Sequence, residues 1–230
     1  MRQNRDQSHS GRYHRFWILG GGRFGQLAVQ RIRHHMPGAE VTVIDEKPTE
    51  LNADRLICAD GIAWLAQHLE EYSPVDMVVP AIPVHVAAGW LQDRLSAQFT
   101  IHAIDPDADW INLLPNAIRG QSGQYFVSHA DFICPDNCPE PEKICTYTKK
   151  TRPLDLFRLL ALMPSHNLTP IVLRSHQLLP GVGGLLPAEL FSALAKATTH
   201  SDQPLMVATA CRCHGVVNLF KLFKKGLQLI

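Results

Sequence analysis

Cysteine residues are the most reactive groups that this 230-residue chain gathers in its sequence. Five of its six cysteines fall in two short clusters, ICPDNCPEPEKIC, with C-x3-C-x6-C spacing, and ACRCHG. Thiolates and imidazoles are the ligands of zinc and of iron–sulfur clusters, which take four such groups. Three ligands from the first cluster and one from the second would complete either site. The candidate ligands are Cys134, Cys138, Cys145, Cys211, Cys213 and His214.

Two other interpretations of the same cysteines stay open. Neighbouring thiols can cycle through a disulfide and serve as a redox pair. Cysteine is also a common small buried residue with no chemical role. The sixth cysteine, Cys58, lies in an apolar stretch and is expected in the core.

A glycine-rich segment near the start of the chain predicts a nucleotide site. FWILGGGRFGQLAVQRI, residues 16–32, places Gly20, Gly22 and Gly25 in the G-x-G-x-x-G pattern. The first glycine permits a tight turn, the second lets backbone approach a pyrophosphate, and the third lets the helix pack on the strand. The helix N-terminus then favours the bound negative charge.

An acidic residue at the end of the next strand indicates which nucleotide binds. Asp45 follows Gly25 by 20 residues. A carboxylate there accepts hydrogen bonds from an adenosine ribose and repels a 2′-phosphate, which favours NAD over NADP. S-adenosylmethionine or another adenine nucleotide could use the same carboxylate. A scaffold without a ligand is the remaining alternative.

A second glycine loop, in VLRSHQLLPGVGGLLP, could bind an anionic group of a substrate through backbone amides. It could equally be a tight connection whose glycines adopt positive φ. The candidate substrate residues are Arg174, His176, Gly183 and Gly184.

These residues need a scaffold, and the hydrophobic pattern predicts an α/β fold. Short apolar strands alternate with amphipathic helices, as in βαβ units with a parallel sheet. We expect a Rossmann-like doubly wound parallel sheet with a smaller, cysteine-containing α/β part at the C-terminal end. The expected division is a flexible arm over residues 1–13, a dinucleotide-binding domain over 14–120 and the cysteine-containing domain over 121–230.

The individual elements follow from the same pattern. In the first domain the expected strands are 15–20, 40–45, 55–58, 76–80 and 100–104, and the expected helices are 22–35, 61–71 and 82–98. In the second domain the expected helices are 154–163 and 187–199, and the expected strands are 170–174 and 205–209. The acidic run DPDAD at 105–109 is expected to cap a helix, and the lysines at 221, 224 and 225 to lie on an exposed helix face.

Composition narrows the range of partners. The formal net charge is +1, from 22 basic and 21 acidic residues, which argues against binding nucleic acid through a broad basic surface. There is no run of 18 apolar residues, so no membrane insertion is expected. We therefore expect a cytoplasmic protein with reduced cysteines and a small-molecule ligand.

The N-terminal residues resemble a known family. WILGGGRFGQLAVQRI and VTVIDEKP are similar to the NAD-binding domain of potassium-uptake regulators, the TrkA-N type, over residues 14–105. The G-x-G-R-F-G turn is typical of that family, so the resemblance adds Arg23 and Phe24 to the cofactor-binding residues. It also implies that Asp60 opens a helix near the adenosine, and that a transporter or a second copy of the chain is the partner.

Two functions from different classes remain. The stretch VVPAIPVHVA, residues 78–87, resembles the fourth strand end of saccharopine-dehydrogenase-like reductases, where it faces the nicotinamide. Similar N-termini also occur in precorrin-2 dehydrogenases. One hypothesis is therefore an NAD-dependent oxidoreductase or redox sensor with a cysteine-ligated metal or iron–sulfur site. The other is a regulatory subunit that responds to NAD without turnover.

Overall fold

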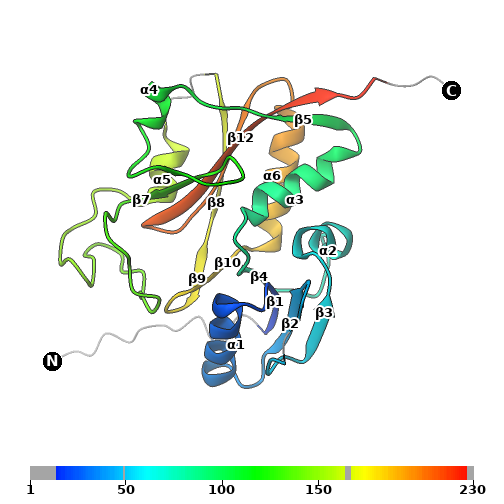
Figure 1. Cartoon of the computed structure of the whole chain (residues 1–230), viewed down its shortest axis with the longest axis vertical. Helices are drawn as coiled ribbons and strands as arrows, with labels where there is room; N and C mark the ends of the chain where they lie inside the picture. Colours follow the sequence, from blue (N-terminus) through cyan, green and yellow to red (C-terminus); the bar gives the residue numbers. More distant parts are fainter. Residues whose placement is uncertain (1–13, 49, 164–166, 227–230) are drawn as a thin grey trace.

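Two large β-sheets, a two-stranded hairpin and the helices around them form the computed structural model, which describes residues 14–48, 50–163 and 167–226. The expected N-terminal arm, residues 1–13, lies outside the described residues. Figure 1 shows the first sheet at the bottom of the view and the second above it, with α3 and α6 side by side. The chain is therefore an α/β protein, as predicted from the sequence.

The first sheet is parallel throughout, with the strand order β3-β2-β1-β4. Its strands are β1 (Arg15–Leu19), β2 (Glu40–Asp45), β3 (Arg55–Cys58) and β4 (Met77–Pro80). The central strands are apolar because both faces of the sheet are covered. All four strands lie within two residues of the ranges expected from the sequence.

Three helices cover this sheet. They are α1 (Arg23–His35) on one face, and α2 (Gly61–His68) and α3 (Val86–Ser96) on the other. Helix α1 buries Ala28, Val29 and Ile32, which recur at helical spacing, and leaves its polar side chains outside. Helix α3 is apolar around most of its circumference, because it lies between the two sheets.

The second sheet is mixed and contains six strands. Its order is β6-β7-β12-β11-β8, with β5 also paired to β12. The strands are β5 (Phe99–Ala103), β6 (Ile118–Arg119), β7 (Tyr125–Ser128), β8 (Thr169–Arg174), β11 (Leu205–Ala210) and β12 (His214–Lys224).

The position of β5 differs from the expectation. The sequence predicted a strand here in the first sheet, but β5 pairs antiparallel with the second half of β12, from Phe220↔Ala103 to Lys224↔Phe99. The edge of the first sheet beside β4 is occupied instead, because Val78 exchanges two backbone hydrogen bonds with Leu185. Hydrophobic periodicity locates a strand but does not name its neighbour, so it could not distinguish the two sheets.

Two further expectations are wrong. Lys221 and Lys224 lie on β12 and Lys225 directly follows it, so none of the three lies on a helix. The stretch is a strand whose buried side chains are those of Val217, Leu219, Phe220 and Leu222. Cys58 is exposed rather than in the core, because β3 is an edge strand. Its thiol donates to the carbonyl oxygen of Glu46 at 3.2 Å.

A short hairpin joins the two sheets. It consists of β9 (His176–Leu179) and β10 (Val182–Gly184), and it turns at Gly181 with φ +70°. Because β10 leads directly into the bridge between Leu185 and Val78, the hairpin lies beside β4. The backbone of Gly184 approaches the Met77 side chain so closely that a Cβ would collide with it.

The remaining helices are α4 (Ala108–Ile111), α5 (Leu156–Ala161) and α6 (Pro187–Thr199). The expected cap is present: the side chain of Asp107 accepts a hydrogen bond from the backbone N–H of Trp110 at 2.7 Å. Helices α5 and α3 pack against β11 from opposite faces of the second sheet, and α6 packs beside α3.

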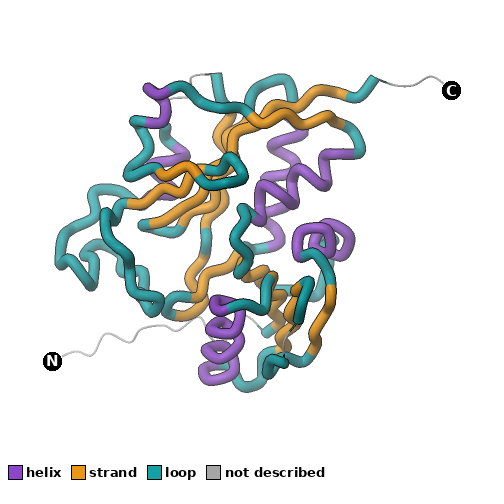
Figure 2. The backbone as a smooth tube through the Cα atoms, viewed as in Figure 1, coloured by secondary structure: helices purple, strands orange, loops and turns teal. Residues whose placement is uncertain are grey.

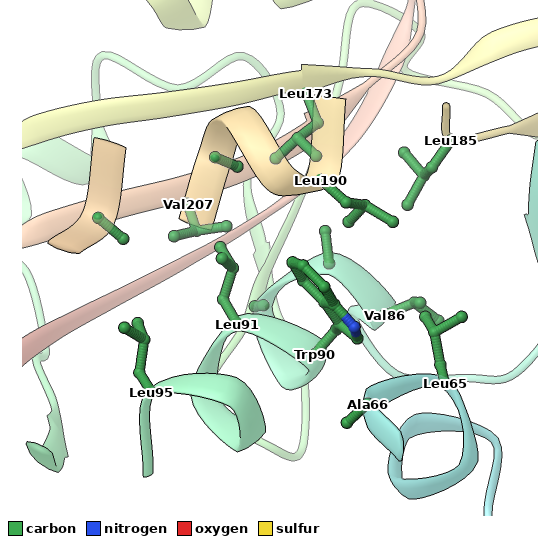
Figure 3. Close-up of a cluster of buried hydrophobic side chains, with 14 of the residues drawn as sticks. Leu65, Ala66, Val86, Trp90, Leu91, Leu95, Leu173, Leu185, Leu190 and Val207 are labelled. Carbon is green, nitrogen blue, oxygen red and sulfur yellow. The ribbon is translucent and has the colours of Figure 1, made fainter. Parts of the chain in front are cut away.

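The largest hydrophobic core lies between the two sheets and belongs to both. Figure 3 shows Trp90 and Leu91 of α3 facing Leu190 of α6 and Val207 of β11, with Leu65 of α2 at the opposite side. The order of layers is therefore α1, first sheet, α2 with α3 and α6, second sheet, α5. None of the helices in the described chain is long and apolar enough to cross a membrane.

Candidate functional site

The three glycines of the turn differ in how closely the rest of the fold packs against them. Gly20 has φ +103°, and a Cβ there would lie 2.7 Å from the carbonyl oxygen of Ala81 at the end of β4. A Cβ on Gly25 would collide with the carbonyl oxygen of Gly20. Gly22, directly before α1, has no atom within 4 Å of the place of its Cβ. The turn is thus packed against the fold at its first and third glycines and open at its second.

The carboxylate of Asp45 faces this turn. Its Oδ2 accepts a hydrogen bond from the backbone N–H of Gly21 at 2.6 Å, and its Oδ1 accepts one from that of Lys47 at 2.7 Å. Asp60 begins α2, where its side chain accepts from the N–H of Ala63 at 2.7 Å. The structure therefore brings Asp45 to the turn and confirms that Asp60 opens the next helix.

The turn lies at the point where the sheet's connections change direction. Strand β1 has β2 on one side and β4 on the other, and α1 covers the opposite face from α2 and α3. In open parallel sheets, ligands bind beyond the carboxyl ends of the strands at such a point. Gly20 and Ala81 mark the ends of the two diverging strands.

A cavity of about 1030 Å³ connects the start of α1 with the cysteines. Phe24, in the first turn of α1, lines one side of it, and its walls come otherwise from β7, the cysteine clusters and the β9–β10 hairpin. The sequence-predicted residues that line it are Phe24, Cys134, Cys138, Gly183, Cys211, Cys213 and His214. Phe24 is the one residue of the predicted nucleotide site in this lining, and Gly20, Gly22 and Asp45 do not belong to it.

The first cysteine cluster is attached to α1. The segment from 129 to 155, drawn as a long loop in Figure 2, has almost no regular structure. Arg23 forms an ion pair of 2.9 Å with Asp136, which lies between Cys134 and Cys138. The Nη1 of Arg31 donates to the carbonyl oxygens of Asp136 at 2.7 Å and Pro180 at 2.6 Å.

The hairpin holds the same loop from its other side. The N–H of Gly181 donates to the carbonyl oxygen of Cys138 at 3.1 Å, and the side-chain amide of Gln177 donates to that oxygen at 2.6 Å. Gln177 and Ser175 line the cavity. Sequence reasoning missed both, although the alternation of side chains along an extended segment could have indicated them.

Arg174 and His176 alternate with these two residues and make other contacts. The guanidinium of Arg174 stacks over the ring of Phe157 at 5.0 Å. His176 Nε2 lies 2.7 Å from a carboxylate oxygen of Glu189 on α6. The structure therefore brings Gly183, but not these two side chains, to the cavity wall.

The thiols differ in their hydrogen bonds. Cys213 Sγ accepts from the Nε of Arg152 at 3.1 Å. Cys211 Sγ accepts from the backbone N–H groups of Cys213 at 3.4 Å and His214 at 3.3 Å. Cys145 Sγ lies 3.5 Å from the N–H of Thr148. The sequence interpretation missed Arg152, which contacts a thiol of the second cysteine cluster. Nothing in the sequence around Arg152 indicates that its partner is a sulfur.

Burial and neighbouring thiols set the pKa values. Burial raises the pKa of Cys134, and the charges of Cys138, Cys213 and Cys145 raise it further. Those three sulfurs therefore lie within electrostatic reach of Cys134. Burial raises the pKa of Cys211 to about 11. The hydrogen bonds from Thr148 lower the pKa of Cys145.

Two histidines lie beside the thiols. His214 Nδ1 is 3.9 Å from the Cys211 sulfur, and burial lowers the pKa of His214. Burial also lowers the pKa of His129, whose Nε2 is enclosed without a hydrogen-bond partner in the described chain. Its backbone N–H donates to the carbonyl oxygen of Cys213 at 2.8 Å. Nothing in the sequence around His129 had marked it as a site residue.

The sulfurs are gathered but do not converge on one point. Within residues 14–48, 50–163 and 167–226, no three Cys, His, Asp or Glu side chains are arranged to hold a single metal ion.

Comparison with known proteins shows which family the chain belongs to. Residues 87–223 match a family described as "AF_1314_C: Uncharacterized protein, C-terminal domain". The chain belongs to this family. A protein of Archaeoglobus fulgidus, titled "Uncharacterized protein", is 28% identical over an alignment that covers 89% of this chain and 98% of that protein. No solved structure matches the chain. The part shared with the family contains β5, both cysteine clusters and the hairpin, while the glycine turn precedes it.

Proposed function

We propose that the chain is an NAD-binding redox protein, an oxidoreductase or a redox sensor, with a cysteine-ligated metal or iron–sulfur site in its second half. One observation carries this proposal: a single cavity extends from Phe24 beside the glycine turn to the cysteines. A cofactor at the turn and a group held by the thiols would then lie at opposite ends of this cavity. The resemblance to the NAD-binding TrkA-N domain supports the first part.

The choice of NAD rests on the turn and its carboxylate. The open position at Gly22 leaves room for a pyrophosphate beside the backbone, and the N-terminus of α1 favours its charge. Asp45 already accepts two backbone hydrogen bonds at this place, and it would accept the ribose hydroxyls of NAD in the same way. The 2′-phosphate of NADP would be repelled by the negative charge of this carboxylate.

The redox part follows from what lies around the cavity. NAD accepts or donates a hydride, and its reaction partner must reach the nicotinamide. Ser175, Gln177 and His214 offer hydrogen-bonding groups to a small substrate along the cavity wall. Phe126 and Phe132 supply the apolar surface that such ligand sites usually have.

A regulatory subunit without turnover is the second candidate, and one observation favours it. Apolar side chains around the cavity are unusually exposed: Ile133 is 97% exposed and Ile118 is 68% exposed. Contiguous exposed apolar surface often marks a docking site for another protein. A transporter or a second copy of the chain would be such a partner.

Nucleotide titration tests the proposal. NAD, NADH, NADPH and S-adenosylmethionine are titrated by calorimetry into the wild-type chain, Asp45→Ala and Glu46→Ala, which removes a neighbouring exposed carboxylate. We expect NAD or NADH to bind the wild type and Glu46→Ala equally, and Asp45→Ala at least about tenfold more weakly, because it loses hydrogen bonds to a charged group. Equal affinity in Asp45→Ala, or binding of S-adenosylmethionine alone, would overturn the proposal. Oxidation of NADH by added electron acceptors would support an oxidoreductase, and binding of NADH without its oxidation would support a regulatory subunit.

A further inference from the structure

One wall of the cavity is an apolar face of the second sheet. Ile118 of β6 lies directly opposite Phe126 of β7, so their side chains are neighbours on one face of the sheet, and both line the cavity. Tyr125, the residue before Phe126, points to the other face and is buried in the core with α5. Neither Ile118 nor Phe126 belongs to a hydrophobic core of the described chain. This face is therefore apolar and open to the cavity.

The other walls add two aromatic rings. Phe24 in the first turn of α1 is 58% exposed and lines the cavity. Phe132 comes from the loop over residues 129–155, which we call the cysteine loop, and its ring stacks on that of Tyr147 at 4.8 Å. Val182 of the hairpin completes the apolar lining. Aromatic rings thus reach the cavity from a helix, a strand and a loop.

The charged side chains of the lining are acidic. They are Asp131 and Glu140, and no lysine or arginine of the described chain belongs to the lining. Two arginines near the cysteines hydrogen-bond the same carboxylate instead, because Arg152 and Arg212 both donate to Asp155. A carboxylate or phosphate in the cavity would therefore meet like charge and no basic partner, which disfavours its binding.

The groups that the sequence suggested for an anionic substrate are engaged elsewhere. Arg174 and His176 do not belong to the lining, and they contact Phe157 and Glu189 instead. The backbone N–H of Gly181, at the turn of the glycine loop, donates to a carbonyl oxygen of the cysteine loop at 3.1 Å. These three groups therefore do not form an anion site in the cavity.

We propose that this cavity binds an aromatic molecule without negative charge, whose rings pack against Phe24, Phe126 and Phe132. The inference rests on the proposed function, which assigns a small substrate to this cavity, and it deepens that function by naming the chemical class. A volume of about 1030 Å³ accommodates a drug-sized ligand. Aromatic rings stack favourably on phenylalanine, and a positive charge on the ligand would be attracted by the ring faces and the two carboxylates.

Three fluorescent anthracene probes with different charges test the inference. Anthracenemethanol is neutral, aminomethylanthracene is a cation at neutral pH, and anthracenecarboxylate is an anion. Their binding to the full chain is measured by fluorescence anisotropy. We expect the neutral probe to bind, the cation to bind at least as tightly, and the carboxylate to bind at least about tenfold more weakly, because it is repelled and unpaired.

A pair of phenylalanine variants tests the position of the site. Phe126→Ala should weaken binding of the neutral probe by about tenfold or more, because it removes one ring from the wall. Phe223→Ala is the matched control: both side chains are 45% exposed, but Phe223 lies near the far end of β12 and does not line the cavity. Its affinity should equal that of the wild type.

A pair of aspartate variants tests the charge. Asp131→Asn should bind the carboxylate probe about fivefold more tightly than the wild type, and it should leave the neutral probe unchanged. Asp202→Asn is the control, because Asp202 is also exposed and lies just before β11, whose other end leads to the cavity. It should change neither affinity.

Three results would overturn the inference: no binding of any probe, carboxylate binding as tight as that of the neutral probe, or unchanged affinity in a folded Phe126→Ala. Far-ultraviolet circular dichroism shows whether each variant is folded. If Phe126→Ala is not, the exposed position 131 decides, and an unchanged carboxylate affinity in Asp131→Asn contradicts the inference.

Nucleotide titration on the same samples separates this inference from the proposed function. NAD binding without probe binding would contradict the aromatic site and leave the nucleotide site in place. Probe binding with the expected charge preference but without NAD binding would support the aromatic site and contradict the proposed NAD-binding redox protein.

Discussion

Each glycine of the turn meets a different physical demand. A methyl group on Gly25 would collide with the Gly20 carbonyl, and one on Gly20 would be forced into positive φ and against Ala81. Gly22 has φ −68° and free space around it. The fold therefore requires the first and third glycines, while only a ligand would require the second.

This contrast gives the first prediction. Gly22→Ala should leave the melting temperature within a few degrees of the wild type, because its methyl group meets no atom within 4 Å. The same methyl group would obstruct a pyrophosphate, so NAD affinity should fall by about tenfold or more. Gly25→Ala should lower stability itself. Thermal denaturation and calorimetric titration measure the two effects, and an unchanged affinity in Gly22→Ala would contradict pyrophosphate binding at this turn.

A buried histidine gives the second prediction. His85, directly before α3, lies 2.8 Å from Asn218 Oδ1 and 2.9 Å from Thr209 Oγ1, and it therefore connects the end of β4 to the second sheet. Its Nδ1 donates to the Asn218 oxygen, and its Nε2 accepts from the Thr209 hydroxyl. Burial lowers its pKa to about 4, so the folded protein holds the neutral ring.

The unfolded chain, with a histidine pKa near 6.5, binds the proton more readily than the folded one. The stabilisation is therefore complete above about pH 6.5 and declines as the pH falls towards 4, by up to about 3 kcal/mol. Urea denaturation at several pH values should show this slope, and His85→Gln should flatten it. His129 and His214, whose pKa values are also lowered, leave a residual slope in the variant. A slope identical to that of the wild type would contradict the assignment.

At the scale of elements, the sequence predicted the positions of most helices and strands but not which strands pair with each other. The first sheet agrees with the pattern because its central strands are short apolar runs buried on both faces, and α1 and α6 agree because each buries one apolar face. Strand β12 escaped prediction because its pairing depends on residues far away in the chain, whereas the hairpin pairs locally but its short, glycine-containing strands resemble a loop. For the site, cysteine spacing predicted a ligand group, but the contacts of Arg152 with Cys213 and of Gln177 with Cys138 join residues 61 and 39 positions apart.

The connection between α1 and the cysteine loop gives the third prediction. Arg31→Ala removes both hydrogen bonds from this helix to the carbonyls of Asp136 and Pro180. Hydrogen exchange of the amides at 134–141 should accelerate by roughly tenfold, since the lost bonds stabilise the docked loop by about 1 to 2 kcal/mol. His34→Ala, on the exposed side of the same helix, is the control. Exchange that stays the same in both variants would show that the loop is held elsewhere.

At the scale of the whole molecule, one core serves two sheets. Leu19 and Val78 of the first sheet, Val207 and Phe220 of the second, and the helices between them belong to a single buried cluster. The region that matches the family begins inside α3, which is the centre of this cluster. The sheet that carries the glycine turn and the sheet beside the cysteine clusters therefore share one hydrophobic core.

This shared core gives the last prediction. Trp90 is fully buried, and its ring packs edge-to-face on Phe191 of α6 at 5.5 Å. Trp90→Ala should lower the free energy of unfolding by about 3 to 5 kcal/mol, and it should do so for both sheets at once. Native-state hydrogen exchange should give the amides of β1 and β11 the same opening free energy in the wild type, and the same reduction in the variant. Tyr72→Ala, at a side chain 91% exposed, should change neither. If β11 kept its protection while β1 lost it, the two sheets would unfold separately, and a nucleotide bound at β1 could not stabilise the cysteine-bearing half through this core.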